Sequence, residues 1–400
     1  MTRPHPTLMV SAKAQKSLAR RHPWIFSGAV QKQDPAIEAG ATVAVRAADG
    51  RFLAWGAYSP QSQIRARVWS FDEDKDIGPA FFQDRIRSAL QVRRTLPLLS
   101  PCTALRLINA ESDSLPGLIV DRYADFLVCQ FLSAGAHFWK ADILQQLREL
   151  VPVKGVYERS DAEVRTKEGL GLESGLLWGE MPPERIEVQW GQIRLWADVI
   201  HGHKTGLYLD QRENQAQVTD FAKDAEVLNC FSYTGGFGLW ALRGGAAHVT
   251  QIDASAEVVS LARENATLNG LENQPVEYVV GNVFDQLRAY RDRRRQFDLI
   301  ILDPPKFVAS AAQMNKGCRG YKDINLLAFK LLRPGGILMT FSCSGLVEPA
   351  LFQKIVADAA IDAGRHARLI APLSQGADHP VALNFPEGHY LKGHICLVDG

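Results

Sequence analysis

The chain has 400 residues, of which 46% are hydrophobic and 22% are charged, which is typical of globular proteins and too long for one ordinary domain. No apolar run approaches the roughly 18 residues of a membrane-spanning helix, and the first residues lack the apolar stretch of a signal peptide. Six cysteines without CxxC spacing argue against a disulfide framework and against a zinc site. We therefore expect a cytoplasmic protein with reduced thiols, no membrane partner and no bound metal.

The net charge of +1 is unevenly distributed along the chain. Residues 1–70 contain ten Lys or Arg and three Asp or Glu, a net charge of +7, so the remaining 330 residues carry a net charge of −6. A basic segment of this kind indicates binding to a polyanion such as RNA. The alternative is a solvated surface with a chance excess of positive charge.

The first elements predict a small β-rich unit followed by an α+β unit. Residues 41–59 alternate on both sides of an Asp49-Gly50 turn, which predicts a hairpin, and residues 63–70 alternate with arginines on one face. After an acidic stretch, residues 81–96 have helical spacing. Two or three strands over 105–132, a helix over 138–151 and further strands over 153–161 and 187–200 complete the middle third.

From Ala225 the pattern changes to strand, helix, strand. This alternation predicts a parallel, doubly wound sheet and an α/β, Rossmann-like domain. We therefore divide the chain into domains at 1–75, 76–190 and 191–400. The predicted strands are 226–231, 248–253, 276–282, 297–303 and 335–343, and the predicted helices between them are 256–270 and 321–332.

The first strand of this sheet opens into a glycine-rich loop, residues 232–238. Glycines allow a tight turn and a close approach of the backbone to a ligand. Asp253 ends the second strand, where a carboxylate can accept hydrogen bonds from ribose hydroxyls. The same glycine spacing also fits a dinucleotide fingerprint, so this loop alone leaves NAD and S-adenosylmethionine open.

Later strand ends favour S-adenosylmethionine. Asn282 can offer its amide to the adenine edge, although it can also be an ordinary turn asparagine. The run Asp303-Pro304-Pro305 is more specific, because the prolines fix the backbone and let neighbouring carbonyls face a ligand, an element that a dehydrogenase does not need. The predicted cofactor contacts are Tyr233, Thr234, Gly235, Gly236, Phe237, Asp253, Ala254, Asn282, Val283 and Asp303.

Cys343 ends the fifth strand, and ligands of doubly wound sheets bind at the carboxyl ends of the strands. The ends of strands one, four and five should bring the glycine loop, Asp303 and Cys343 into one crevice. A thiolate there can add to C6 of a pyrimidine that has left its stack, which makes C5 nucleophilic. Asp303 can donate a proton or hydrogen bond at N3 of the ring.

The cysteines also allow other interpretations. The alternative for Cys343 is a small buried hydrophobic residue. Cys318 is a rival thiol in a predicted basic loop with Lys316, Arg319 and Lys322, whose charges would lower its pKa. We interpret that loop as a clamp for a substrate phosphate, and we expect the remaining four cysteines to be structural.

Several long motifs resemble one known family over the whole chain, the RlmI family of bacterial 23S rRNA cytosine-C5 methyltransferases. The resemblance implies an N-terminal PUA β-barrel that binds RNA, a central α+β domain and a class I methyltransferase domain. It also implies S-adenosyl-L-methionine as cofactor, 23S rRNA as partner and Cys343 as nucleophile, with Thr205, Tyr208, Asp210 and Gln211 at the methionine end of the cofactor pocket. The motifs are 18–30, 115–123, 203–214, 303–307, 318–323, 341–345 and 379–393.

One position departs from related enzymes. Many RNA cytosine-C5 methyltransferases carry a second cysteine where this chain has Pro305, so the group that removes the C5 proton is unassigned. Two other functions stay open: methylation of a base nitrogen without a cysteine nucleophile, and RNA binding without catalysis. The sequence does not identify the target nucleotide. It also leaves open whether the substrate is naked RNA or an assembled subunit, and whether the protein forms a homodimer.

Overall fold

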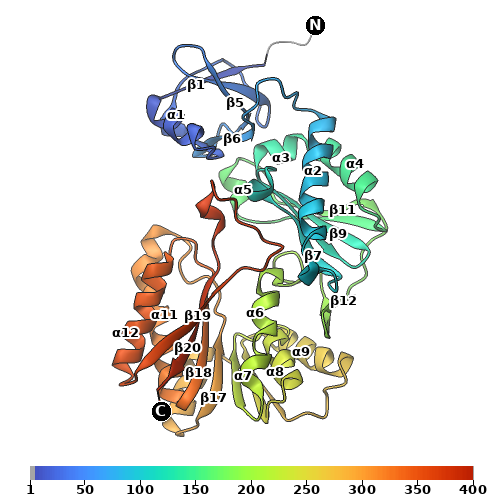
Figure 1. Ribbon diagram of the computed structural model, residues 1–400. Helices are drawn as coiled ribbons and strands as arrows, with labels where there is room; N and C mark the ends of the chain where they lie inside the picture. Colours follow the sequence, from blue (N-terminus) through green and yellow to red (C-terminus); the bar gives the residue numbers. More distant parts are fainter. Residues whose placement is uncertain (1–4, 400) are drawn as a thin grey trace. The chain divides into compact units, whose positions relative to one another are not determined.

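The structure is a computed structural model that describes residues 5–399, and the chain divides into two units (Figure 1). The first unit runs to Val188 and also contains Ala197–Leu209 and Ala377–Gly388. The second contains Gln189–Trp196, Asp210–Gly376 and the chain from His389 onward. None of the helices within residues 5–399 combines the length and apolarity that a membrane crossing requires.

A six-stranded sheet with the order β2-β6-β5-β4-β1-β3 begins the first unit. The β1–β4 pair is parallel and the other pairs are antiparallel. Strands β4 and β5 form the hairpin predicted around Asp49-Gly50. Leu8, Val45 and Val68 belong to its apolar core. The elements are β1 (Thr7–Val10), α1 (Ala12–Ala19), β2 (Trp24–Phe26), β3 (Val30–Gln33), β4 (Thr42–Arg46), β5 (Phe52–Tyr58) and β6 (Ile64–Ser70).

One arginine of the predicted basic surface is buried instead. Arg67 on β6 is 6% exposed, and its guanidinium contacts Glu168 at 2.9 Å and Glu111 at 3.4 Å. An alternating pattern places Arg67 on one face of the strand but does not say which face is covered. Its charge is therefore paired inside the first unit and does not contribute to the exposed basic surface that the sequence predicts.

The second sheet of the first unit has the order β11-β10-β9-β8-β7, in which β9 and β10 are parallel. Helices α2 and α4 pack together over it, with Phe82, Leu127 and Ile143 in the shared core. Residues 105–132 form three strands, in line with their pattern. The elements are α2 (Pro79–Arg94), β7 (Ala104–Asn109), β8 (Leu118–Tyr123), β9 (Phe126–Phe131), α3 (Ala134–Phe138), α4 (Lys140–Leu150), β10 (Gly155–Ser160), α5 (Val164–Lys167) and β11 (Glu173–Gly179). A separate two-stranded pair, β12 (Ile186–Trp190) and β13 (Ile193–Ala197), follows along the chain and includes Gln189–Trp196 of the second unit.

Arg165 on α5 ties three segments of this sheet together. Its side chain is fully buried, and its Nε donates to the carbonyl oxygen of Gly171 at 2.6 Å. Its two Nη atoms contact the carbonyl oxygen of Phe131, at the end of β9, and the carboxylate of Glu173, at the start of β11. A buried cation is tolerated because each side of the guanidinium meets an oxygen.

The sheet of the second unit has the order β16-β15-β14-β17-β18-β20-β19. The five strands predicted from the sequence, β14 to β18, are parallel to one another, as predicted. Strands β19 and β20 were not predicted, and β20 is antiparallel to both β18 and β19. A long return, residues 375–391, lets β20 enter between β18 and β19 in the opposite direction. The strands are β14 (Glu226–Cys230), β15 (His248–Asp253), β16 (Val276–Val280), β17 (Phe297–Leu302), β18 (Leu332–Ser342), β19 (Ala367–Ser374) and β20 (Lys392–Val398).

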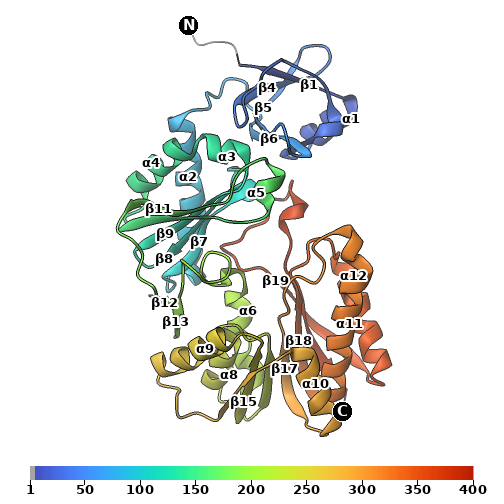
Figure 2. The same ribbon diagram turned by 180° about the vertical axis from the view of Figure 1, so that it is seen from behind.

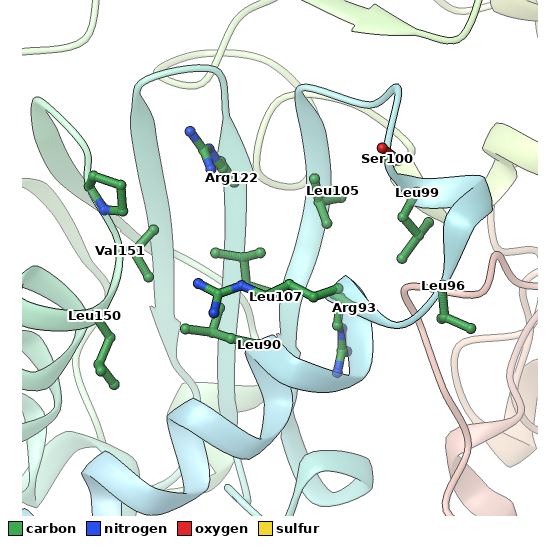
Figure 3. Close-up of a pocket in the computed structure, with 12 residues that line it drawn as sticks. Leu90, Arg93, Leu96, Leu99, Ser100, Leu105, Leu107, Arg122, Leu150 and Val151 are labelled. Atoms are coloured by element: carbon green, nitrogen blue, oxygen red, sulfur yellow. The ribbon is translucent and has the colours of Figure 1, made fainter.

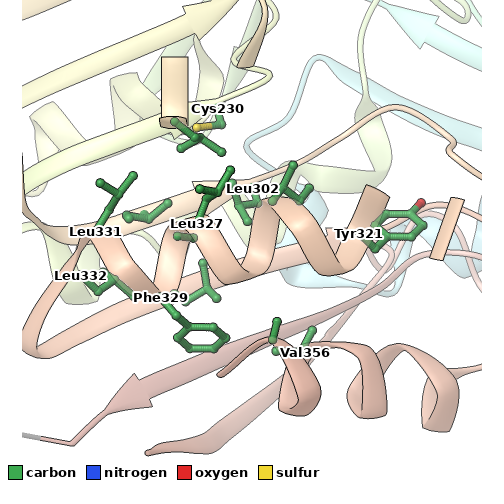
Figure 4. Close-up of a cluster of buried hydrophobic side chains, with 14 of the residues drawn as sticks. Cys230, Leu302, Tyr321, Leu327, Phe329, Leu331, Leu332 and Val356 are labelled. Carbon is green, nitrogen blue, oxygen red and sulfur yellow. The ribbon is translucent and has the colours of Figure 1, made fainter. Parts of the chain in front are cut away.

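Helices cover both faces of this sheet (Figures 1 and 2). The chain moves from β14 outward to β16 and then crosses back to β17, and right-handed crossovers in opposite directions place their helices on opposite faces. Helices α10, α11 and α12 share one hydrophobic cluster with the sheet, which includes Leu302, Tyr321 and Leu327 (Figure 4). The helices are α6 (Arg212–Ala216), α7 (Thr219–Ala222), α8 (Gly236–Arg243), α9 (Ala256–Leu268), α10 (Val283–Asp292), α11 (Met314–Leu331) and α12 (Pro349–Asp362).

We expect Arg165→Met to destabilise the first unit by about 1–3 kcal/mol, because the change leaves the buried carbonyl oxygen of Phe131 without the Arg165 donor. Urea unfolding followed by tryptophan fluorescence measures the effect. Arg87→Met is the matched control, because Arg87 is 56% exposed and its contact with Asp84 is a surface ion pair, so a change of only about 0.5 kcal/mol is expected. Equal stability of the two variants would contradict the role given to Arg165.

Candidate active site

The loop after β14 has an unusual backbone. Phe231, Tyr233 and Gly235 have φ angles of 58°, 47° and 86°, so three alternate residues are left-handed. Two of them are not glycine, and such strained conformations persist only where the surroundings enforce them. The backbone N–H of Tyr233 donates to Asp253 Oδ2 at 2.9 Å, which links this loop to the end of β15.

The glycines of this loop serve packing as well as turning. Gly235 has the left-handed conformation that caps helix α8. A side chain at Gly238 would meet Gln251 at 2.5 Å, so this glycine lets the helix contact β15. Thr234 and Phe237 are buried, and the Phe237 ring lies 5.6 Å from that of Phe341. Their side chains therefore face the interior, and a cofactor contact from these two residues would use their backbone.

Asn282 begins helix α10 as its N-cap. Its side-chain oxygen accepts from the backbone N–H groups of Phe284 at 2.9 Å and Asp285 at 3.4 Å. The structure thus shows Asn282 in the alternative role, that of an asparagine stabilising a turn. Its contact with adenine stays a prediction. Val283 is 3% exposed and packs in the core, whereas Ala254 is exposed after β15.

Asp303 follows β17 and is half-buried. Its Oδ1 accepts from Gln211 Nε2 at 2.8 Å, and Gln211 Oε1 accepts in turn from Asn214 Nδ2 at 2.7 Å. The buried Asp210 accepts from the Tyr390 hydroxyl at 2.5 Å. Gln211 entered the predicted site only through the family resemblance, and its contact gives it a physical role as the residue that orients the Asp303 carboxylate.

Cys343 comes directly after β18 and is half-buried, and its Sγ lies 4.0 Å from the carbonyl oxygen of Pro304. The thiol and the Asp-Pro-Pro segment are thus side by side, as the adjacency of β17 and β18 requires. Cys129, Cys230 and Cys396 are buried among apolar groups, and burial raises the pKa of Cys396 to about 12. Among the six cysteines, Cys343 combines partial exposure with a place at a strand end.

The turn containing Cys343 is fixed by the neighbouring Ser344. Its hydroxyl oxygen accepts from the backbone N–H of Val308 at 3.1 Å and lies 2.9 Å from the Tyr321 hydroxyl. Lys392 donates to the carbonyl oxygens of Ser344 and Val347, both at 2.7 Å. Sequence reasoning missed Tyr321 and Lys392, although both lie inside the quoted motifs 318–323 and 379–393.

The expectation for Cys318 was wrong in two respects. The residue lies within helix α11 and not in a loop, and burial raises its pKa instead of basic neighbours lowering it. Lys322, one of the residues expected to clamp a phosphate, forms an ion pair with Asp362 at 2.7 Å. Gly317 lets this helix approach Phe307 and Val308 so closely that a Cβ would lie 2.4 Å from the Val308 side chain.

Thr205 and Tyr208 belong to the first unit. The Thr205 hydroxyl is buried and donates to Asp121 Oδ2 at 2.7 Å, and the Tyr208 hydroxyl lies 3.2 Å from His203 Nδ1. Lys204 stacks over the Tyr208 ring. These contacts account for the local positions of both side chains, and their predicted contact with the cofactor stays a prediction.

A hollow in the first unit has a volume of about 290 Å³ and is lined largely by leucines of α2, β7 and nearby turns (Figure 3). Arg93, Arg94 and Arg122 also line it. Arg93 is committed to a two-point ion pair with Asp113. The residues predicted for methyl transfer are not part of this hollow.

Two family models match the chain. Residues 8–71 match the PUA-like domain, and residues 173–379 match the S-adenosylmethionine-dependent methyltransferase. Among solved structures, a putative SAM-dependent methyltransferase from Streptococcus mutans has a TM-score of 0.84 at 23% identity, covering 98% of this chain and all of that one. A second, a putative methyltransferase complexed with SAH, has a TM-score of 0.85 at 23% identity, with the same coverage. These likenesses concern the fold.

Curated relatives are much more similar in sequence. Ribosomal RNA large subunit methyltransferase I from Aeromonas salmonicida is 52% identical over 381 residues, which is 95% of this chain and 96% of that protein. The proteins of the same name from Tolumonas auensis and Escherichia coli O139:H28 are 51% and 49% identical and cover 97% and 98% of this chain, and 98% and 99% of their own lengths. The chain therefore belongs to the ribosomal RNA large subunit methyltransferase I family, and its catalytic part is an S-adenosylmethionine-dependent methyltransferase domain.

Proposed function

We propose that this protein methylates C5 of a cytosine in 23S rRNA, with Cys343 as the nucleophile and S-adenosyl-L-methionine as the methyl donor. The observation that carries the proposal is the position of the Cys343 thiol, 4.0 Å from the Pro304 carbonyl oxygen and next to the Asp303 carboxylate segment. The relatives named for large-subunit ribosomal RNA support the substrate class. Methylation of a nitrogen would need no thiol at this place.

The residues at the strand ends suit the cofactor. Each oxygen of Asp253 accepts one backbone N–H, from Tyr233 and from Ser255, which leaves lone pairs for two ribose hydroxyls. The buried Oε1 of Gln215, packed against Gly236, has no hydrogen-bond partner among the described residues and can accept from an ammonium group. When bound here, S-adenosylmethionine supplies a methyl group on a sulfonium, which is electrophilic enough for attack by carbon.

The side chains then have distinct tasks. The Cys343 thiolate adds to C6 of the flipped cytosine, and the displaced electron pair makes C5 nucleophilic. The Asp303 carboxyl, held by Gln211, holds a proton or hydrogen bond at N3 and so stabilises the charge that addition places on the ring. The Pro304 carbonyl oxygen can accept from the exocyclic amine, which cytosine has and uracil lacks.

Release of the product requires loss of the C5 proton and departure of the Cys343 thiolate from C6. Related enzymes use a second cysteine for the proton, and this chain has the exposed Pro305 there. Tyr321 is buried, and burial raises the pKa of its hydroxyl, so it is a poor base at neutral pH. We infer that water accepts the C5 proton, because the thiolate itself must leave in the same step.

Replacement of Cys343 by Ala should lower methyl transfer to 23S rRNA by about 10³-fold or more, since no other group can form the adduct. The assay uses rRNA from a strain lacking this protein, with mass analysis of the methylated nucleoside. Cys318→Ala is the matched control, because Cys318 is also half-buried, and should retain activity. A 5-fluorocytosine RNA should form a stable adduct with the unchanged protein and none with C343A. Full activity of C343A would rule out the nucleophile.

Asp303→Asn should lower kcat by about 10²-fold, the usual range for a group that manages a proton in the transition state, with a smaller effect on KM. Asp298→Asn is the comparison on the same strand, because Asp298 lies near the opposite end of β17 and pairs with Arg333. Steady-state kinetics with saturating methyl donor measure both. Equal losses in the two variants would indicate a structural effect on β17 and contradict the role of Asp303.

The exposed basic residues Lys13, Lys16 and Arg20 on and after α1 should contribute to rRNA binding. Replacing all three by Gln should weaken binding and reduce the slope of log K against log salt concentration by about 2, since each phosphate contact releases counterions. Filter binding over a range of salt concentrations measures the slope. The control replaces Lys330 and Lys354, exposed lysines of the second unit, and should leave the slope unchanged. An unchanged slope in the triple variant would exclude this surface.

A further inference from the structure

Lys392 has an unusual position for a lysine. It is the first residue of β20, and in the antiparallel pairing of β18 with β20 its register partner is Ser342, the residue before Cys343. The residue as a whole is only 3% exposed. Lysines are rarely buried to this degree without a carboxylate partner, because an ammonium group loses its hydration on burial.

The partners of this ammonium are carbonyl oxygens on the turn that holds the candidate nucleophile. Nζ donates to the carbonyl oxygen of Ser344 and to that of Val347, both at 2.7 Å, and no ion pair of Lys392 occurs among residues 5–399. An ammonium has three N–H donors, so one remains after these two bonds. Two short charge-assisted hydrogen bonds to one turn fix its path directly after Cys343.

The charged groups around Lys392 come from three segments. Burial lowers the pKa of Lys392 to about 8, while the thiolate form of Cys343 and the carboxylate of Glu348 raise it and Lys306, after β17, lowers it. From α11, the Tyr321 hydroxyl contacts the same turn through Ser344. At neutral pH the ammonium is therefore mostly charged, and the attraction between it and a Cys343 thiolate is reciprocal.

We propose that Lys392 is a positioning residue for Cys343: it holds the turn that aims the thiol and places a positive charge beside the thiolate. The proposal rests on the proposed function, in which that thiolate attacks C6 of cytosine. A thiolate is the reactive form of cysteine, and a neighbouring cation increases its fraction at neutral pH. Because backbone carbonyl oxygens already hold the buried ammonium in place, the protein does not have to rearrange when the thiolate forms.

The test measures the reactivity of the thiol separately from methyl transfer. Alkylation of Cys343 by iodoacetamide is followed against pH by peptide mass spectrometry, with the half-buried Cys318 as an internal control in the same samples. In the unchanged protein we expect an apparent pKa for Cys343 below the ordinary value of about 8.5 and below that of Cys318. An apparent pKa at or above 8.5 would overturn the proposal without any variant.

Three variants separate the charge from the hydrogen bonds. Lys392→Met removes both and should slow alkylation of Cys343 at pH 7 by about tenfold, the effect of one pKa unit. Lys392→Gln keeps donors and should slow alkylation similarly while restoring stability towards that of the unchanged protein. Lys392→Arg keeps the charge and should recover most of the reactivity. In all three, alkylation of Cys318 should not change.

Arg365→Met is the matched control, because Arg365 is a half-buried cation that donates to the Leu332 carbonyl oxygen at the opposite end of β18. The Arg365→Met variant should leave the pH dependence of Cys343 alkylation unchanged. An unaltered profile in both the Met and the Gln variant of Lys392 would contradict the proposal. With 23S rRNA, the loss in K392M should fall on kcat and not on KM. If C343A retains methyl transfer while K392M still slows alkylation, the proposed nucleophile fails and the effect of Lys392 on the thiol stands.

Discussion

The arrangement of this site depends on one buried hydroxyl group, that of Ser344. It joins the turn after β17 through the Val308 N–H, the turn after β18 through its own backbone, and helix α11 through the Tyr321 hydroxyl. Leaving such a buried donor unpaired costs about 1–3 kcal/mol, so the three segments are held together. Because Asp303 precedes one turn and Cys343 lies in the other, this hydroxyl fixes the distance between the carboxylate and the thiol.

The order of the strands explains why the second unit can hold this site. Parallel strands β14, β17 and β18 bring three strand ends to one edge, each with a different chemical group. The antiparallel strand β20 runs the other way, so its first residue, Lys392, reaches the edge where β18 ends. A parallel strand in that position would have presented its last residues there. The reversed strand is therefore what brings a cation to the turn of the cysteine.

Much of this was predictable from the sequence, because strand ends follow from periodicity. The left-handed loop after β14, Asp253, Asp303 and Cys343 all lie at ends of strands that short apolar runs mark clearly. The side-chain directions were less accessible: Val283 and Phe237 face the core, and only the packed structure decides that. The role of Lys392 was not predictable, because its partners are backbone carbonyl oxygens 45 and 48 residues away. Every residue has a carbonyl oxygen, so the sequence does not indicate which ones a lysine will contact.

The helix α11 is the clearest case in which tertiary packing overrides local preference. Its glycines favour a loop, but they are the residues that let the helix approach Phe307 and Val308. The same close approach brings Tyr321 to Ser344, so a sequence feature that looks like a break in a helix is a requirement of the site. Four aromatic rings cluster beside this helix: the centroid of the Phe307 ring lies within 6.3 Å of the ring centroids of Phe231, Phe284 and Tyr321.

The burial of Arg67 has a consequence for handling the protein. Charges that contact RNA must lie at the surface, where dissolved ions weaken them, whereas Arg67 and its partners Glu111 and Glu168 are shielded from those ions. Binding of the proposed rRNA substrate and packing of the first unit would thus depend on different sets of charges. Concentrated salt would weaken RNA binding during purification while leaving the ion pair between Arg67 and Glu168 intact.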